Sequence, residues 1–190
     1  ETKNMSRRQI AQELECNFNT SGETVIDPDN MEWIMSNIQE PKHKTGFDRN
    51  FWIWEEYDPS CNYLLAADVA RGDGADSSTF HILKLETMEI VGEYMGKPTP
   101  DLYAKSTHEY IDQHLGEHRT GAIAGFSTTS KTRPLIVAKL EEFVRNKLVK
   151  TYSSRLANEF RTFIWYNGKP QAMRGYNDDL VMALAICCWV

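Results

Sequence analysis

Three runs of apolar residues in the middle of the chain have the length and the alternation of β-strands. They read "NYLLAADVA", "STFHILKL" and "MEIVGEYMG". A loop rich in Gly and Asp separates the first two runs, and a short turn separates the last two. Because strands joined by short connections pair antiparallel with their neighbours, this block predicts a three-stranded antiparallel meander.

The residues before this block predict a lead-in of helices and one strand. The stretches "MSRRQIAQELEC" and "DNMEWIMSNIQ" each contain a capping residue followed three positions later by Gln or Glu, and then apolar residues at helical spacing. In the second stretch Asp29 is the expected N-cap. "NFWIWEEYD" then alternates as a strand does and stops before Pro59. We expect residues 1–58 to pack on a main domain of residues 59–190.

Helical patterns dominate after the meander. "PTPDLYAK" has a Thr-Pro helix start, and "TRPLIVAKLEEFVRNKLV" has a similar start at Thr132 and an apolar stripe that extends to Leu148. "SSRLANEFRTFIWYNGKPQAMRG" predicts a helix, a strand and a turn. The last helix begins at the adjacent pair Asp178 and Asp179 and continues as an apolar run. Strands followed by helices in this order predict an α/β fold.

Composition favours one compact domain. With 190 residues, 41% of them apolar and 25% charged, the chain can bury a substantial core. Its longest apolar run, Leu180 to Val190, is shorter than the ~20 residues that a membrane span needs, and no signal-peptide pattern opens the sequence. We expect a soluble protein without membrane contact. Four cysteines without CxxC spacing are expected to be reduced core residues of an intracellular protein: Cys16, Cys61, Cys187 and Cys188.

Charge is distributed unevenly along the chain, whose net charge is −6. Residues 119–174 hold eleven Lys or Arg and three Asp or Glu, a net charge of +8, which leaves −14 for the rest. A basic half of this kind can present a surface to phosphate groups, and a solvated helix face explains the same residues equally well. Within it, Lys131 and Arg133 are candidate contacts to DNA phosphates, with ordinary helix-start residues as the alternative.

Asp68 is an acidic residue at the end of an apolar strand pattern, "YLLAAD". A buried carboxylate is costly unless it is protonated, paired with a base or bound to a cation. At the other end of the chain, helix capping and the helix dipole explain one acidic residue before the last helix, but Asp178 and Asp179 are two.

The order of these elements is that of an RNase H-like nuclease: a strand with an embedded Asp, two further antiparallel strands, helices, and acidic residues that open a closing helix. In such sites carboxylates from distant elements hold two divalent ions about 3.5–4 Å apart, which clamp an in-line phosphoryl displacement. Mg²⁺ suits this chemistry because it prefers oxygen ligands and keeps several waters.

Three blocks of the sequence resemble a known family. "NYLLAADVARGDGADSSTFHILKL", "KTYSSRLANEFRTFIWYNGKPQAMRG" and "NDDLVMALAICCWV" are similar to the C-terminal nuclease domain of the large terminase subunit of T-even-like tailed bacteriophages, which packages viral DNA. The resemblance runs from about Arg7 to the end of the sequence. It implies an α/β fold with an RNase H-like (RuvC/integrase-type) mixed sheet flanked by helices.

The resemblance also implies an activity, a cofactor and partners. The activity is Mg²⁺-dependent endonuclease cleavage of concatemeric double-stranded viral DNA, with Mn²⁺ as a substitute ion. The partners are an ATPase domain of the same polypeptide, the small terminase subunit and the portal, in the host cell cytoplasm. Asp68 matches the first metal-binding aspartate of the family and the pair Asp178–Asp179 its third acidic motif. Asp68, Asp179 and Asp178 are therefore the candidate catalytic and metal-binding residues, and spacing does not decide which of the pair binds the ion while the other caps or supports the helix.

Two features depart from the family pattern. The family has a Glu at the end of a hydrophobic strand after the helix that follows the meander, whereas "DLYAKSTHEYIDQ" passes from a helix start into a polar segment. Either the motif is deleted or, as we expect, a segment between Lys105 and Ser106 is missing from the sequence, with Glu109 as the only nearby substitute for the motif. No GxxxxGK[ST] phosphate loop occurs, so ATP hydrolysis is expected to reside in another domain.

Other readings of the acidic and histidine residues stay open at this point. "HLGEH", residues 114–118, fits the HxxEH pattern of zinc proteases, although a Gly in its middle favours a polar loop. Asp73 and Asp76 in "RGDGADSS" resemble a calcium loop that lacks its closing Glu. The second function class is a non-catalytic interaction module of a DNA-packaging or recombination machine, in which the acidic residues only cap and solvate.

Overall fold

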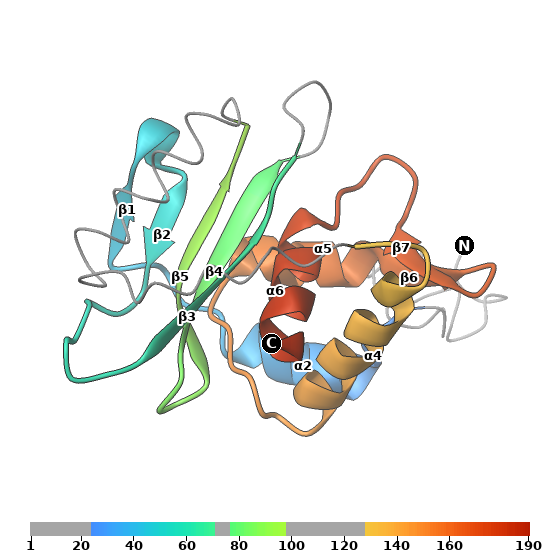
Figure 1. Cartoon of the computed structure of the whole chain (residues 1–190), viewed down its shortest axis with the longest axis horizontal. Helices are drawn as coiled ribbons and strands as arrows, with labels where there is room; N and C mark the ends of the chain where they lie inside the picture. Colours follow the sequence, from blue (N-terminus) through green and yellow to red (C-terminus); the bar gives the residue numbers. More distant parts are fainter. Residues whose placement is uncertain (1–23, 71–76, 98–127) are drawn as a thin grey trace, which may run out of the picture.

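The computed structural model describes residues 24–70, 77–97 and 128–190. These residues form two layers, a β-sheet and a group of helices that covers one of its faces (Figure 1). The strands of the sheet are β1 (His43–Thr45), β2 (Phe51–Ile53), β3 (Tyr63–Asp68), β4 (Ser78–Lys84) and β5 (Glu89–Gly96). The other elements are α2 (Pro28–Ser36), the short 3-10 helix η3 (Phe47–Arg49), α4 (Thr132–Arg145), α5 (Ser154–Thr162), β6 (Phe163–Tyr166), β7 (Lys169–Ala172) and α6 (Asp179–Trp189).

The predicted meander is confirmed. β3 pairs antiparallel with β4, and β4 pairs antiparallel with β5. β2 adds to the free edge of β5 and β1 adds to β2, which gives the strand order β1-β2-β5-β4-β3. Strands from the lead-in therefore extend the same sheet. The pairs between these strands are all antiparallel, and parallel pairing within the described residues occurs at the isolated bridge between Glu89 of β5 and Lys150.

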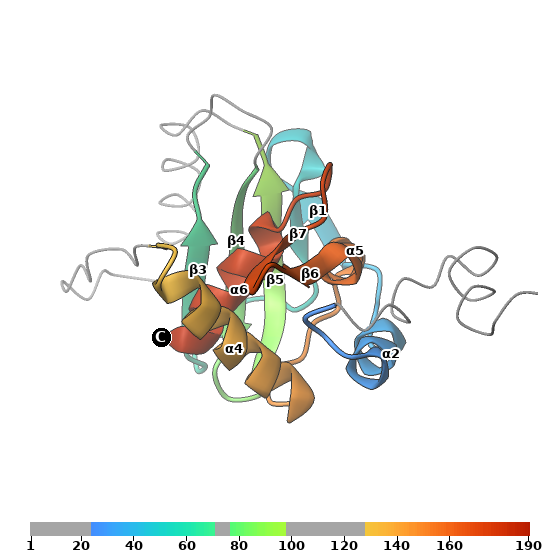
Figure 2. The same cartoon turned by 90° about the vertical axis from the view of Figure 1, so that its right-hand side faces the viewer.

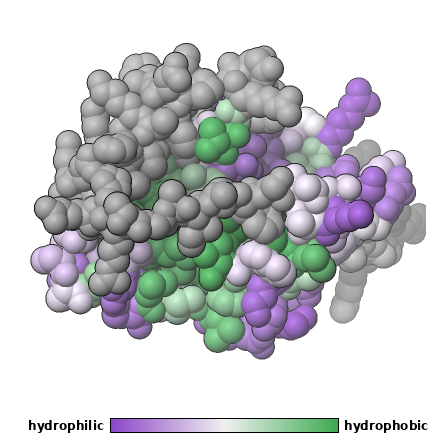
Figure 3. Space-filling model, in the orientation of Figure 1, coloured by the Kyte–Doolittle hydropathy of each residue, from purple (hydrophilic) through white to green (hydrophobic). Residues whose placement is uncertain are grey.

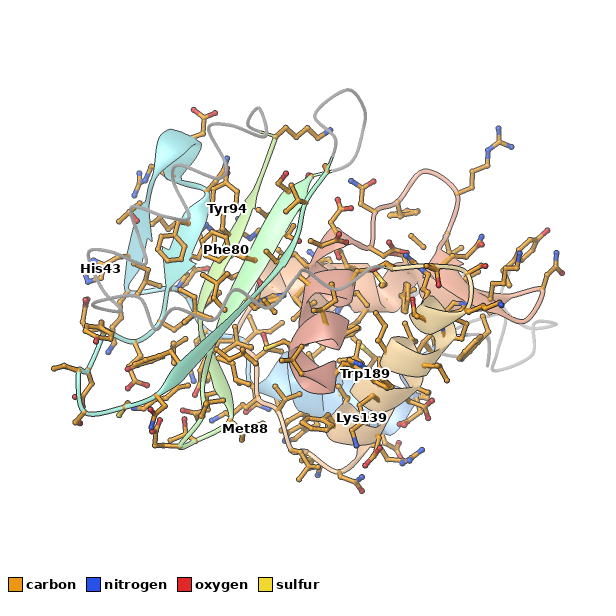
Figure 4. The ribbon with its side chains drawn as sticks, in the orientation of Figure 1. His43, Phe80, Met88, Tyr94, Lys139 and Trp189 are labelled. Atoms are coloured by element: carbon orange, nitrogen blue, oxygen red, sulfur yellow. The ribbon has the colours of Figure 1, made fainter. Side chains whose placement is uncertain are left out.

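Strand β4 is buried on both faces, and its side chains alternate between two sets of neighbours. Phe80 lies on the face away from the helices, where it stacks on Tyr94 of β5 with ring centroids 5.3 Å apart (Figure 4). Thr79 and His81 face the helices and hydrogen-bond to the backbone of α6. Because successive strand residues point to opposite faces, one strand supplies both an aromatic cluster and two polar contacts to the last helix.

Helix α6 lies at the centre of the helical layer. It packs against β3 and β4 on one side and against α4 on the other (Figure 2). Its residues from Asp179 to Cys188 are all buried, and a helix that is apolar all round is typical of a core position. Apolar atoms also gather on the visible surface where the two layers meet, with hydrophilic atoms around them (Figure 3). No helix of the described residues is long and apolar enough to cross a membrane.

The start of α2 differs from the sequence prediction. Asp29 is not the N-cap but lies in the first turn, and Asp27 caps the helix by accepting the Asn30 N–H at 2.9 Å. Pro28 takes the first helical position, where a missing N–H leaves no intrahelical bond unmade. The capping pattern identified the helix correctly and placed its start two residues late. Aspartates flank Pro28 on both sides, and Asp29 is the one that lies three residues before Glu32, as the capping box requires.

Helix α4 begins at Thr132 as expected, but its capping hydroxyl comes from Thr129, which accepts the Thr132 N–H at 3.1 Å. The predicted apolar stripe is too long, since α4 ends at Arg145 and Leu148 lies beyond it, exposed. After α5, the predicted strand and turn continue into a second strand, β7. The hairpin turn uses Asn167 and Gly168 at φ values of 49° and 72°, the left-handed conformations that a two-residue hairpin turn requires.

Several sequence predictions fall outside the described residues. They concern the helices at "MSRRQIAQELEC" and "PTPDLYAK", the junction of Lys105 and Ser106, Glu109, the segment His114–His118, Asp73 and Asp76.

Candidate functional site

A polar cavity of about 320 Å³ lies where β3 ends and α6 begins. Four separate parts of the chain line it: the end of β3, the start of α4, strand β7 and the loop that leads into α6. The lining residues are Asp68, Arg133, Gln171, Ala172, Tyr176, Asn177, Asp178 and Asp179. The three acidic residues predicted from the sequence therefore line one cavity.

Asp68 and Asp179 both lie next to Thr79 at the start of β4. Asp68 is the last residue of β3 and lies opposite Thr79 in the β3–β4 ladder. The Thr79 hydroxyl donates to the Asp179 carbonyl at 2.9 Å, and the Ser77 N–H donates to the Asp179 carboxylate at 2.8 Å. The start of β4 thus fixes both the backbone and the carboxylate of Asp179 beside the end of β3.

Asp178 faces a different set of partners from its neighbour. Its Oδ2 accepts the Ala172 N–H at 2.9 Å and forms an ion pair with the guanidinium of Arg133. Arg133 also donates from Nε to the Pro170 carbonyl at 3.0 Å. Asp178 is the N-cap residue of α6 by its backbone position, yet its side chain makes no capping hydrogen bond. Its side chain therefore joins the start of α6 to α4 and β7.

The carboxyl group that caps α6 belongs to Glu159 of α5, which the sequence analysis did not single out. Its Oε2 accepts the Val181 N–H at 3.0 Å, and its side chain is buried. Burial, followed by the proximity of other carboxylates that include Asp179, raises the pKa of Glu159 from 4.5 to about 9. The Glu159 carboxyl is therefore protonated at neutral pH.

One sequence signal points to the burial of Glu159. Leu156, Glu159 and Phe160 have the i, i+3, i+4 spacing of a single helix face. Leu156 and Phe160 are fully buried, and this places the acidic residue between them on the core side of α5. An acidic residue within a core-facing stripe requires a partner, which the structure identifies as the α6 backbone.

A buried network of polar side chains connects α6 to the start of α5. His81 Nε2 lies 3.0 Å from the Leu180 carbonyl, which as an acceptor requires the proton on Nε2. Burial lowers the pKa of His81. Its Nδ1 lies 3.8 Å from Glu93, whose Oε1 accepts from Ser153 Oγ at 2.7 Å and from Arg155 Nε at 2.9 Å. The first turn of α6 is thus held from β4, β5 and α5 together.

The donor set of the cavity suits a hard divalent cation. Asp68, Asp179 and Asn177 bring carboxylate and amide oxygens to the lining, and Mg²⁺ is commonly bound through one or two carboxylates while it keeps several waters. No group of three or more His, Cys, Asp or Glu side chains among the described residues is arranged to hold an ion. A third acidic ligand, which the family pattern implies, is accordingly not found within residues 24–70, 77–97 and 128–190.

The two basic residues predicted to contact DNA differ in their surroundings. Lys131 is exposed and precedes α4 directly. Arg133 is two residues further on, lines the cavity and forms an ion pair with Asp178. The structure therefore assigns Arg133 a contact within the site that the sequence did not predict.

The structure resembles solved nuclease domains of phage large terminases, whereas no protein-family profile matches the sequence. The large terminase nuclease of the thermophilic phage G20c with bound magnesium superimposes with a TM-score of 0.69 at 18% identity, over 88% of this chain and 97% of that one. The nuclease domain of the Thermus phage P74-26 large terminase gives a TM-score of 0.66 at 19% identity, over 83% and 92%.

A zinc-bound form of the G20c nuclease gives a TM-score of 0.60 at 18% identity, over 83% of this chain and 96% of that one. Identities this low establish the fold alone. The described sheet and helices together with these neighbours show that the chain has the RNase H-like fold of the large terminase nuclease domains.

Proposed function

We propose that this chain is the metal-dependent endonuclease domain of a large terminase subunit, which cleaves concatemeric double-stranded viral DNA during genome packaging. One observation carries the proposal: Asp68 and Asp179 line one polar cavity in a chain with the fold of terminase nucleases. The solved G20c nucleases contain magnesium, cobalt or zinc, which supports a divalent ion as the cofactor of this site.

In this proposal Asp68 and Asp179 bind the ion, and Mg²⁺ is its physiological form with Mn²⁺ as a substitute. When bound, the ion supplies a water of lowered pKa and neutralises charge on the phosphate. Asn177 donates to the Asp179 carboxylate at 3.3 Å and helps to orient it. Asp178, held by Arg133, fixes the loop that leads into α6. Asp178 thus supports the site and Asp179 is the ligand.

Contacts to DNA phosphates are proposed for cations beside the cavity that no carboxylate neutralises. Lys131, Lys169 and Arg174 form no ion pair with any described residue. Lys169 belongs to β7 and Arg174 to the loop that leads to α6, and both elements line the cavity. Phosphate contacts of this kind position DNA without reading its sequence. Arg133 is already engaged by Asp178, so we assign it to the site and Lys131 to DNA.

The wider setting follows from the sequence resemblance to T-even-like phages, whereas the structural neighbours come from other phages. We propose a nuclease core of residues 59–190 preceded by a lead-in of residues 1–58 that contributes β1 and β2 to the same sheet. The partners would be an ATPase domain of the same polypeptide, the small terminase subunit and the portal. The protein would act in the host cytoplasm, transiently on the procapsid.

Plasmid nicking with and without Mg²⁺ tests the proposed activity. We expect the wild-type chain to cut supercoiled plasmid only with the ion, and Asp68→Ala and Asp179→Asn to lose cutting while they still bind DNA in a gel shift. Asp29→Asn is the matched control, because Asp29 is an exposed carboxylate in the first turn of α2. Cutting by Asp68→Ala at the wild-type rate would end the proposal.

The same assay distinguishes the proposed nuclease from the alternative of a non-catalytic interaction module. That alternative expects no Mg²⁺-dependent cutting by any variant and unchanged DNA binding after Asp68→Ala. It also expects Asp68 to lie apart from the pair before α6, whereas all three aspartates line one cavity.

A further inference from the structure

The first turn of α6 is held in place by polar groups that lie outside the cavity. The Thr79 hydroxyl binds the carbonyl of Asp179 at 2.9 Å, and His81 binds the carbonyl of Leu180 at 3.0 Å. The carboxyl of Glu159 binds the N–H of Val181 at 3.0 Å. Three consecutive helical residues thus each have a tertiary partner, and the first of them is the proposed metal ligand.

Glu159 fills a position that a local residue usually fills. The first N–H groups of a helix have no intrahelical acceptor, and the side chain of the N-cap residue normally accepts one of them. Here Oδ2 of Asp178 is bound by Arg133 and by the Ala172 N–H, and the side chain makes no capping hydrogen bond. The Val181 N–H is buried with the helix, and its acceptor comes from Glu159 of another element.

Glu159 lies behind the cavity and not in it. Glu159 is 8% exposed and is not among the residues that line the cavity. Its Oε1 has no hydrogen-bond partner among the described residues. Its contact to α6 is therefore the one through Oε2 to the third residue of the helix. This hydrogen bond therefore joins Glu159 to the α6 backbone at Val181, which is two residues after Asp179.

We propose that Glu159 is a positioning residue for metal binding: its carboxyl caps α6 from the neighbouring helix α5 and thereby fixes Asp179 in register with Asp68. The inference rests on the proposed function for the role of Asp179. It assigns to Glu159 no contact with the ion, the substrate or the reacting atoms. Only the acceptor oxygen is needed, so a neutral amide of the same shape should serve as well.

Three variants separate capping from ligation and from general stability. Glu159→Gln keeps an acceptor oxygen in place, Glu159→Ala removes it, and Asp27→Ala removes a cap of comparable type from α2, away from the cavity. Mg²⁺ affinity is measured by the dependence of the melting temperature on Mg²⁺ concentration and by the half-saturating Mg²⁺ concentration in plasmid nicking. Amide exchange at Val181 is measured without metal.

We expect Glu159→Gln to bind Mg²⁺ within about twofold of wild type and Glu159→Ala to bind it about 10–100-fold more weakly, as is usual when a group that orients a ligand is removed. Asp27→Ala should lower the melting temperature without changing Mg²⁺ affinity. Protection of the Val181 amide should fall in Glu159→Ala and persist in Glu159→Gln.

Two results would overturn the inference. Equal loss of Mg²⁺ affinity in the Gln and Ala variants would mean that the ionised carboxylate binds the ion directly, and wild-type affinity in Glu159→Ala would mean that the cap does not position Asp179. If circular dichroism shows Glu159→Ala unfolded, Glu159→Asp, which withdraws the carboxyl by one methylene, replaces it. A wild-type chain that binds no Mg²⁺ would refute the proposed function, and exchange at Val181 would still show whether Glu159 caps α6.

Discussion

Adjacent aspartates take different partners at the start of α6. Asp179 receives hydrogen bonds from Ser77 and Asn177, whereas Asp178 is bound by Arg133 and Ala172. One residue of sequence separation is enough for this, because neighbouring side chains at a helix start point about 100° apart around the axis. The pair therefore combines an acidic group directed at the cavity with an ion pair that anchors the loop.

This division predicts distinct effects of two isosteric substitutions. Asp179→Asn should abolish Mg²⁺-dependent cutting and leave stability nearly unchanged. Asp178→Asn should lower the free energy of unfolding by about 1.5–3 kcal/mol, the usual contribution of a hydrogen bond to a charged group, and reduce cutting only in part. Urea unfolding and nicking at saturating Mg²⁺ measure the two effects. The assignment is wrong if Asp178→Asn is the variant that loses all activity at full stability.

The protonation of Glu159 predicts a pH dependence of stability. Its pKa is about 9 in the folded state against 4.5 ordinarily, so between these values the folded chain holds a proton that the unfolded chain has released. The stabilising contribution is complete below pH 4.5 and is lost as the pH rises towards the folded-state pKa. Glu159→Gln cannot ionise, so its free energy of unfolding relative to wild type should rise by up to about 1.4 kcal/mol per pH unit.

Urea unfolding in EDTA at several pH values from 5 to 8 measures this difference. Glu32→Gln, at an exposed position of α2, is the control and should follow the wild type at every pH. Parallel curves for Glu159→Gln and wild type would show that Glu159 is ionised in the folded state.

The acidic residues of the site could be predicted because each interrupts or precedes an apolar run. Asp68 ends a strand pattern and the pair opens a helix, so both stand out against their surroundings. Glu159 does not stand out, since it lies among polar residues in "SSRLANEFRT", a stretch that also suits a surface helix. The partner of Arg133 could not be predicted either, because an ion pair between residues 45 positions apart does not affect the local spacing of residue types.

At the scale of elements, the spacing of apolar residues and the residue types in the turns were sufficient to predict the meander, α4, α5 and α6. What they could not supply was the order of strands in the sheet, since β2 pairs with β5 across a long separation in the chain. The exact helix starts also required the structure: Asp27 and Thr129 are caps that compete with equally suitable neighbours. Local preferences thus identify elements, and tertiary packing selects their boundaries.

Helix α6 should be sensitive to truncation of a side chain at its centre. Leu184 is fully buried at its centre, so Leu184→Ala should lower the free energy of unfolding by about 2–5 kcal/mol through lost burial and the cavity left behind. Leu135→Ala on α4 is the matched control, because Leu135 is 56% exposed and its truncation should cost far less. Urea unfolding compares the two variants. Equal losses would contradict the central position of α6.

At the scale of the molecule, charge is segregated, and much of the basic half is neutralised internally. Arg133, Lys139, Arg145, Lys150 and Arg155 each pair with a carboxylate. In the proposed function, a chain with a net charge of −6 attracts DNA through cations that have no carboxylate partner among the described residues, such as Lys131. Binding through exposed cations of this kind is screened by salt.

Cleavage by the isolated chain should consequently fall as salt is added, with a slope set by the number of cations that contact phosphates. Each cation that neutralises a phosphate contributes about 0.9 to the slope of log affinity against log salt concentration. Lys131→Glu should reduce this slope by about that amount and weaken DNA binding while Mg²⁺ affinity stays at the wild-type value. Lys42→Glu, an exposed site outside the basic half, is the control. Gel shifts between low and moderate salt measure the slopes, and identical slopes for the two variants would exclude Lys131 as a phosphate contact.

The helix that presents Asp179 also carries two thiols near its other end. Cys187 and Cys188 are buried, and burial raises the pKa of Cys187 to about 12 and that of Cys188 as well. Since the thiolate is the reactive form, an alkylating reagent reaches these sulfurs only in the moments when α6 detaches from the sheet. Cys61, which is partly accessible, reacts without such an event. The slow phase of alkylation therefore reports how often the last turn of α6, at the opposite end of the helix from Asp179, opens to solvent.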